Sequence, residues 1–185
     1  MANVHYKRYK FYVDNVIEVW QLNDGNILIP YVLLLECMPD PKYYEEMSVG
    51  EEFDCGGRTL STADINNYVA LSGNTGSAHM NEVAAKEAGF DGQVVHGFAA
   101  VAIQQGMALD IFKRNGGGLY GYDKIRFIKP LYVGDTLNLK VTVEDLEDYD
   151  EDNGMITFKR ELYKEGDEDP SFFAISKHLI AKQDS

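Results

Sequence analysis

The carboxyl-terminal part of the chain alternates between apolar and polar residues. Such alternation covers four consecutive runs: 124–128, 136–143, 155–163 and 171–181. A period of two in consecutive runs is typical of an antiparallel sheet with one buried face. The sequence Val133-Gly134-Asp135 predicts a tight turn between the first two strands. An earlier strand is expected within 49–60, with a bend or bulge at Gly56-Gly57.

The segment 94–112 has no proline and is apolar on most faces, which is the pattern of a helix in a protein interior. Two shorter helices are expected before it. The first begins at Ser61-Thr62-Ala63-Asp64, with Thr62 as its cap, and stops at Ser72-Gly73. The second covers 81–88 and ends at Gly89. One long buried helix followed by antiparallel strands predicts an α+β fold in which a curved sheet wraps around a central helix.

Residues 1–42 have a different pattern. Asn23-Asp24-Gly25-Asn26 lies between two β-rich runs, 16–22 and 27–35, and Asp-Gly in that position indicates a hairpin. Pro39 and Pro41 then interrupt the chain. We therefore expect a hairpin-like extension over 1–42, which packs on the main domain or on a partner subunit, followed by one domain over 43–185.

Composition narrows the classes of partner. The 185 residues are 45% apolar, which suits one domain with an added terminal segment. The net charge of −13 argues against a nucleic-acid partner, because such binding needs clustered Lys and Arg facing phosphates. Seven of the nine residues in 144–152 are acidic, and they are interpreted as a solvated surface.

The compartment is expected to be the reducing cytoplasm. The two cysteines, Cys37 and Cys55, are too few for a disulfide framework or a metal-ligand set, so no metal is expected. The amino-terminal residues lack the apolar core of a signal peptide. The longest apolar-rich run, 27–35, falls far short of the ~20 residues that cross a bilayer, so no membrane contact is expected.

The loop SGNTGSAH, residues 72–79, combines small residues with one histidine. A histidine in such a loop is either an ordinary hydrogen-bonding residue or a group for proton transfer near neutral pH. Three other blocks accompany it: GQVVHG at 92–97, the glycine-rich connection 115–121, and IRFIKPLYVGDT at 125–136. Together with YVALSG at 68–73, these blocks resemble the MaoC-like dehydratases, or (R)-specific enoyl-CoA hydratases, which have the hot-dog fold. The resemblance covers roughly 43–182.

The resemblance implies a set of site residues. His79 matches the family's acid–base histidine, Gly97 its oxyanion donor, and Asn74 stands where the family has an aspartate. Gly76 replaces an asparagine of the family loop and Ser77 replaces a proline. The expected catalytic residues are thus His79, Asn74 and Gly97, and the expected substrate-binding residues are Gly76, Ser77, Val95, His96 and Phe98.

The implied function is the reversible hydration of an enoyl thioester carried by CoA or an acyl carrier, in a homodimer or larger homo-oligomer, without any prosthetic group. An amide cannot accept a proton, so Asn74 can only orient water. Either His79 works alone, or another carboxylate such as Asp64 or Glu82 has taken over, or the protein binds acyl-CoA without turnover. A hot-dog thioesterase that uses Glu82 is a further alternative. The candidates to meet CoA phosphates are basic: Arg58, Lys113, Arg114, Arg126 and Lys129.

Overall fold

The computed structural model describes residues 6–13, 15–22, 27–28, 41–112 and 118–183, and the chain divides between Asp40 and Pro41 into two compact units. The first unit holds three antiparallel strands in the order β1-β2-β3, with bounds Tyr6–Val13, Asn15–Leu22 and Ile27–Leu28. The β2–β3 pairing agrees with the predicted hairpin, whose turn at 23–26 lies outside the described residues. The β1–β2 pairing was not predicted.

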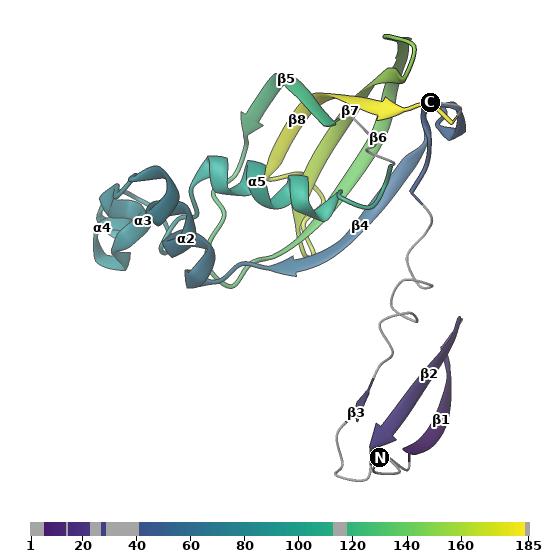
Figure 1. Ribbon diagram of the computed structural model, residues 1–185. Coiled ribbons are helices and arrows are strands. Elements are labelled where there is room, and N and C mark those ends of the chain that lie inside the picture. Colours follow the sequence, from purple (N-terminus) through teal and green to yellow (C-terminus); the bar gives the residue numbers. More distant parts are fainter. Residues whose placement is uncertain (1–5, 14, 23–26, 29–40, 113–117, 184–185) are drawn as a thin grey trace. The chain divides into compact units, whose positions relative to one another are not determined.

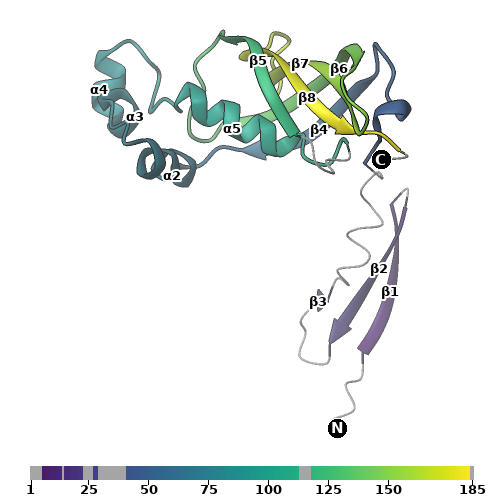
Figure 2. The same cartoon turned by 45° about the horizontal axis from the view of Figure 1, so that its top comes forward.

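The second unit is built on a five-stranded antiparallel sheet with the strand order β4-β6-β7-β8-β5. Its strands are β4 (Glu52–Thr59), β5 (Gly118–Phe127), β6 (Thr136–Asp148), β7 (Asn153–Lys164) and β8 (Phe172–Ala181). A short 3₁₀ helix, η1 (Tyr44–Glu46), precedes β4. Helix α5 (Gly97–Met107) runs along one face of the curved sheet (Figures 1 and 2). The predicted α+β hot-dog fold is confirmed.

Alternation along the strands decides which face of the sheet is buried. The inward positions are every second residue: Leu137, Leu139, Val141 and Val143 on β6, Ile156, Phe158 and Leu162 on β7, and Phe172, Ala174 and Ile180 on β8. Helix α5 covers this face with its own buried residues, among them Ala99, Ala100 and Ile103. Because two of these are alanines, the helix backbone can approach the sheet closely, and the apolar area buried between them drives folding.

The central helix is shorter than the pattern predicted. It begins at Gly97 because the residues before it are extended: Val94 forms a bridge with Tyr132, and the Val95 N–H donates to the Leu131 carbonyl at 2.7 Å. An apolar run does not by itself distinguish a buried helix from buried extended chain. The helix therefore starts at the point where the chain leaves the Leu131–Tyr132 segment.

The three helices near the start of α5 also differ in detail from expectation. Helix α2 (Thr62–Ser72) has Ser61 and not Thr62 as its N-cap, and the Ser61 N–H and hydroxyl both donate to the Asp64 carboxylate at 2.8 Å. The left-handed Gly73, with φ of 70°, ends it. A four-residue helix, α3 (Ser77–Met80), forms where a loop was expected, and α4 (Glu82–Glu87) follows it with Asn81 as the N-cap. Figure 1 shows these helices gathered beyond the amino-terminal end of α5.

Two predicted bends are confirmed. The pairing of β4 with β6 shifts register between Cys55 and Arg58, which is a bulge at Gly56-Gly57. Gly134 adopts a φ of 97° in the turn before β6, and its N–H donates to the Leu60 carbonyl. The first bend lies in β4, which leads into α2, and the second lies just before β6, so both are in segments that connect the sheet to the region of the candidate site.

Candidate active site

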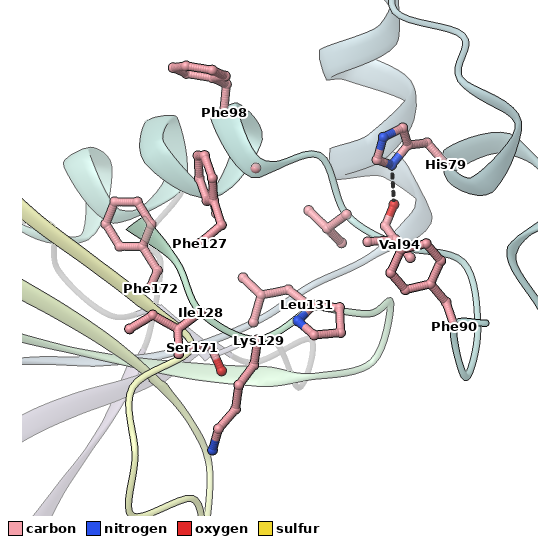
Figure 3. A pocket seen from close by; sticks show the side chains of 14 residues that line it. His79, Phe90, Val94, Phe98, Phe127, Ile128, Lys129, Leu131, Ser171 and Phe172 are labelled. Atoms are coloured by element: carbon pink, nitrogen blue, oxygen red, sulfur yellow. Dashed lines mark hydrogen bonds between the residues drawn. The ribbon is translucent and has the colours of Figure 1, made fainter. Parts of the chain in front are cut away.

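A cavity of about 400 Å³ lies at the amino-terminal end of α5, against the segment that joins β5 to β6. Its walls are mainly apolar: Phe90, Val94, Val95, Phe98, Ala100, Phe127, Ile128, Pro130, Leu131 and Phe172. Its other members are His79, Gly97, Lys129 and Ser171. Figure 3 shows His79 on one side of the cavity and Phe172 on the other. An apolar cavity with a few polar groups suits a ligand that has a hydrocarbon part and one polar end.

His79 enters the cavity from the short helix α3. Its Nδ1 lies 2.8 Å from the Val94 carbonyl oxygen, the contact drawn as a dashed line in Figure 3. A carbonyl only accepts, so Nδ1 carries the proton and Nε2 of the neutral ring keeps its lone pair. The backbone is held as well, since the His79 carbonyl accepts from Gln93 Nε2 at 2.6 Å. His79 is therefore an oriented imidazole with one basic nitrogen available.

Asn74 lies in the turn between α2 and α3, is exposed, and does not line the cavity. Its side-chain Oδ1 accepts from the Gly76 N–H at 3.2 Å, which leaves the amide NH₂ as a donor. A methyl group on Gly76 would lie 3.2 Å from His79 Cδ2 and 3.4 Å from Asn74 Oδ1. The side chains of Asn74 and His79 thus both lie against Gly76, and glycine keeps the space between them open.

Gly97 is the first residue of α5, and a side chain would not fit there. A Cβ at this position would lie 2.8 to 3.1 Å from three ring atoms of Phe127. The first N–H groups of a helix have no intrahelical acceptor, and they carry partial positive charge. The first acceptor of α5 is the His96 carbonyl, which receives the Ala99 and Ala100 N–H groups. The Gly97 N–H comes before these two donors and therefore has no carbonyl of the helix to bond to. It is suited to an oxygen on which negative charge develops.

His96 lies behind His79 and is only 2% exposed. The two imidazole rings stack with their centroids 3.7 Å apart and an interplanar angle of 22°. The His96 Nε2 donates to the Asn74 carbonyl at 3.0 Å. Burial lowers the pKa of His96; the hydrogen bond to Asn74 opposes this, and a positive charge on His79 lowers it further. The net lowering favours the neutral form of His96.

The structure brings together only part of the set of residues implied by the resemblance. His79, Gly97, Val95 and Phe98 line one cavity, whereas Gly76 and Ser77 do not line it. Asp64, one proposed substitute for the missing carboxylate, accepts hydrogen bonds from Ser61 and Arg58. Glu82, the other substitute, is paired with Lys86 at 2.6 Å. No aspartate or glutamate is among the described residues that line the cavity.

Sequence reasoning missed the far wall of the cavity. Phe127, Leu131 and Phe172 come from strand ends and from the β5–β6 connection. Their pattern predicted core or strand positions, and no local signal distinguishes a core residue from a residue that lines a cavity. Ser171 was also missed; its hydroxyl is buried and has no hydrogen-bond partner among the described residues.

The basic candidates have different surroundings. Arg58 is paired with Asp64, and Lys129, which lines the cavity, is 3.2 Å from an Asp167 carboxylate oxygen. Arg126 is exposed at the end of β5, and its guanidinium donates to the Ile125 carbonyl. Lys113 and Arg114 lie outside the described residues. Two basic candidates are therefore close to the cavity: Lys129 lines it, and Arg126 immediately precedes the cavity-lining Phe127 in the sequence.

Two further kinds of site, a metal centre and a membrane-spanning helix, are absent from the described part of the chain. No group of three or more His, Cys, Asp or Glu residues there is arranged to hold a metal ion. None of the helices within 41–112 and 118–183 has the length and apolar character that a membrane crossing requires.

Comparisons with known proteins connect this geometry to a family. The family model described as "MaoC like domain" matches residues 45–163. Protein MaoC of Klebsiella aerogenes is 38% identical over 104 residues, which are 56% of this chain and 31% of that protein. The (R)-specific enoyl-CoA hydratase of Rhodospirillum rubrum is 29% identical over 104 residues, which are 56% of this chain and 71% of that protein.

Among solved structures, the monoamine oxidase regulatory protein of Archaeoglobus fulgidus superposes with a TM-score of 0.70 at 26% identity. The match covers 78% of this chain and 97% of that chain. By contrast, the present chain matches only about a third of the length of the Klebsiella protein. The matched family model, which includes α3 and the start of α5, shows that the chain belongs to the family of MaoC-like dehydratase domains.

Proposed function

We propose that this protein is a hydro-lyase that reversibly adds water to the double bond of an enoyl thioester carried by CoA or by an acyl carrier. One observation carries the proposal: His79, with a basic Nε2, and Gly97, with the first N–H of a helix, line the same apolar cavity. Family membership and the relative named (R)-specific enoyl-CoA hydratase support it.

In the proposed reaction the acyl chain occupies the apolar cavity and the thioester oxygen accepts from the Gly97 N–H. His79 Nε2 removes a proton from a water molecule as the water oxygen bonds to carbon 3. The electrons of the carbon–carbon double bond move toward the thioester oxygen, where the Gly97 N–H stabilises the charge. The imidazolium of His79 then returns its proton to carbon 2. No prosthetic group is needed, since the substrate brings its own phosphopantetheine.

Asn74 has the supporting role in this proposal. Its Oδ1 is occupied by the Gly76 N–H, so its NH₂ group donates to the oxygen of the attacking water. It cannot share the proton transfer, which leaves His79 as the acid–base group. This division of roles makes a distinct prediction for each of the two residues.

The test is the loss of enoyl-thioester absorbance with a panel of trans-2-enoyl-CoA substrates of increasing chain length. We expect the native protein to turn over part of the panel and His79→Ala to lower kcat by about 10²- to 10⁴-fold, the usual contribution of a general acid–base group. Asn74→Asp is expected to keep or increase activity. Asn67→Asp on the exposed face of α2 is the matched control, because it makes the same change in charge outside the site.

Three other outcomes have clear meanings. Activity that appears only in Asn74→Asp would indicate a protein that binds acyl thioesters without hydrating them. That second candidate function is favoured by the absence of an aspartate or glutamate among the described cavity-lining residues. If neither the native protein nor Asn74→Asp turns over any substrate of the panel, the hydratase proposal is refuted. Hydrolysis that depends on Glu82 would instead identify a thioesterase.

We further propose that the protein acts as a homodimer, in the cytoplasm. Strand β5 is an edge of the sheet, and large apolar side chains are exposed on it and on α5, with Phe98 and Tyr120 each 60% exposed. Exposed apolar groups on an edge strand favour association with another chain. Phe98 and Phe127 also line the cavity, so a second copy that covers them would close one side of it. Sedimentation velocity tests this proposal, with a monomer expected for Tyr120→Lys.

A further inference from the structure

The imidazole of His96 connects three parts of the proposed site without lining the cavity. Its backbone caps α5 immediately before Gly97, and its carbonyl accepts from the Ala99 and Ala100 N–H groups at 3.0 and 3.2 Å. Its side chain reaches back across 22 residues to the Asn74 carbonyl. One face of its ring stacks against His79. A single side chain thus contacts the turn of Asn74 and the ring of the proposed base, next to the proposed oxyanion donor.

The hydrogen bonds fix the tautomer of both rings. The Asn74 carbonyl can only accept, so His96 carries its proton on Nε2, and its Nδ1 is buried without a hydrogen-bond partner among the described residues. His79 carries its proton on Nδ1, which donates to Val94. The two stacked imidazoles are therefore each anchored by one N–H to a different backbone carbonyl, and of the two rings only His79 lines the cavity.

A neutral His96 is a suitable neighbour for a base. When His79 takes a proton it becomes a cation, and a second cation 3.7 Å away would oppose that step. A neutral aromatic ring at the same distance instead stabilises a cation stacked on it. Within the described part of the chain, the other titratable ring in contact with His96 is Tyr68 from α2, at 4.7 Å between centroids. Because the turn of Asn74 supplies no carboxylate, the Val94 carbonyl and the stacked His96 ring are the groups in contact with His79 that can support the imidazolium.

We propose that His96 is a positioning residue of this site: as a neutral imidazole it holds the His79 ring by stacking and ties the Asn74 turn to the start of α5. This inference rests on the proposed function for its effect on rate, and its effect on the His79 ring can be measured without turnover. The two contacts of His96 can also be separated by substitution. His96→Gln keeps an amide donor for the Asn74 carbonyl and loses the ring, whereas His96→Phe keeps a ring and loses the donor.

The first measurement is steady-state kinetics on enoyl-CoA. Losing either the hydrogen bond or the ring contact is expected to lower kcat about 3- to 10-fold, with KM changed by less than about 2-fold. His96→Ala loses both contacts and is expected to lower kcat about 10- to 100-fold. The matched control is His178→Gln, which removes another fully buried histidine, in β8 and outside the cavity lining. It should lower the melting temperature and leave kcat of the folded protein unchanged.

The second measurement is the ¹⁵N NMR signature of the His79 ring, recorded on the native protein and on each folded variant. We expect a single Nδ1–H tautomer in the native protein and in His96→Phe, and mixed tautomers in His96→Gln. If the native protein turns over no enoyl thioester, the proposed function fails, yet this result for the His79 ring would still support the positioning role. An unchanged His79 tautomer in His96→Gln and His96→Ala would overturn the inference, whatever happens to kcat.

Discussion

Arg160 offers the sharpest test of how the second unit is held together. It is fully buried on β7, and its guanidinium donates to three side chains: Ser176 Oγ at 2.8 Å, Gln104 Oε1 at 2.8 Å and His178 Nε2 at 3.1 Å. Gln104 in turn donates to the Tyr122 hydroxyl at 2.6 Å. Through these bonds one charged side chain connects β7 and β8 to α5 and β5, at the layer where the helix meets the sheet.

The size of the expected effect follows from what Arg160→Met leaves behind. Methionine has a similar length, but it donates to none of the three acceptors. Each buried polar atom that loses its partner costs about 1 to 3 kcal/mol, which gives a gross loss of about 3 to 9 kcal/mol for the three. Removing the guanidinium also removes its desolvation penalty of several kcal/mol. We therefore expect Arg160→Met to lower the free energy of unfolding by about 3 kcal/mol.

Urea denaturation followed by circular dichroism measures this free energy, provided that the slope of the transition stays the same. A triple variant, Arg160→Met with Gln104→Leu and His178→Phe, supplies the contrast. It removes two of the three stranded acceptors, Gln104 Oε1 and His178 Nε2, together with the donor, and leaves only the Ser176 hydroxyl. Apolar replacements of buried charged networks are often neutral or stabilising. We expect it to recover most of the loss. A single variant that costs less than about 1 kcal/mol, or a triple variant less stable than the single one, would refute the reasoning.

Three further predictions concern single positions. A Cβ on Gly154 would clash with three ring atoms of Tyr44, so Gly154→Ala should lower the free energy of unfolding by about 1 to 3 kcal/mol. In a double-mutant cycle, Gly154→Ala should cost nothing when Tyr44→Ala has already removed the ring. Burial raises the pKa of the Cys55 thiol to about 11, although the nearby Arg160 charge lowers it. In a Cys37→Ser protein, where Cys55 is the remaining cysteine, the thiol should therefore resist alkylation at pH 8 until urea unfolds the protein. Because the folded pKa of His96 is lowered, its contribution to stability is present above the unfolded value of ~6.5 and is lost as pH falls toward the folded value. Native protein should accordingly lose more stability than His96→Gln between pH 7 and pH 5, and equal losses would contradict this linkage.

The sheet was predictable because its information is local. Strands β6, β7 and β8 bury every second residue, and that periodicity is visible in the chain. Helix α3 was not predictable in the same way, since four residues are too few to show a helical period. The start of α5 was misplaced because Val94 and Val95 are as apolar as the helix that follows. Their pairing with the Leu131–Tyr132 segment keeps them extended.

The candidate site also combines residues that local sequence predicted with residues that depend on the tertiary structure. The resemblance implied His79 and Gly97 as site residues, and they come from separate helices and line one cavity. The walls opposite them, at Phe127, Leu131 and Phe172, depend on how strand ends and a connection meet in space, and no short stretch of sequence encodes that meeting. The role proposed for His96 could not be predicted from the sequence for the same reason, since its contacts, Asn74 and His79, lie in a different part of the chain.

The Asn74 turn retains the geometry that a carboxylate would use. The Asn74 Oδ1 accepts the Gly76 N–H, and a carboxylate oxygen accepts the same bond more strongly. Asparagine and aspartate have the same shape, so the exchange needs no movement of Gly76 or of the His79 ring that lies against it. What changes is the chemistry of one group: a carboxylate carries a negative charge and can accept a proton, whereas the Asn74 amide is neutral and donates. In the native protein the imidazolium of His79 is supported by the Val94 carbonyl and the His96 ring. The difference between native protein and Asn74→Asp therefore reports the combined effect of a negative charge, a lost NH₂ donor and a gained proton acceptor in an otherwise unchanged turn.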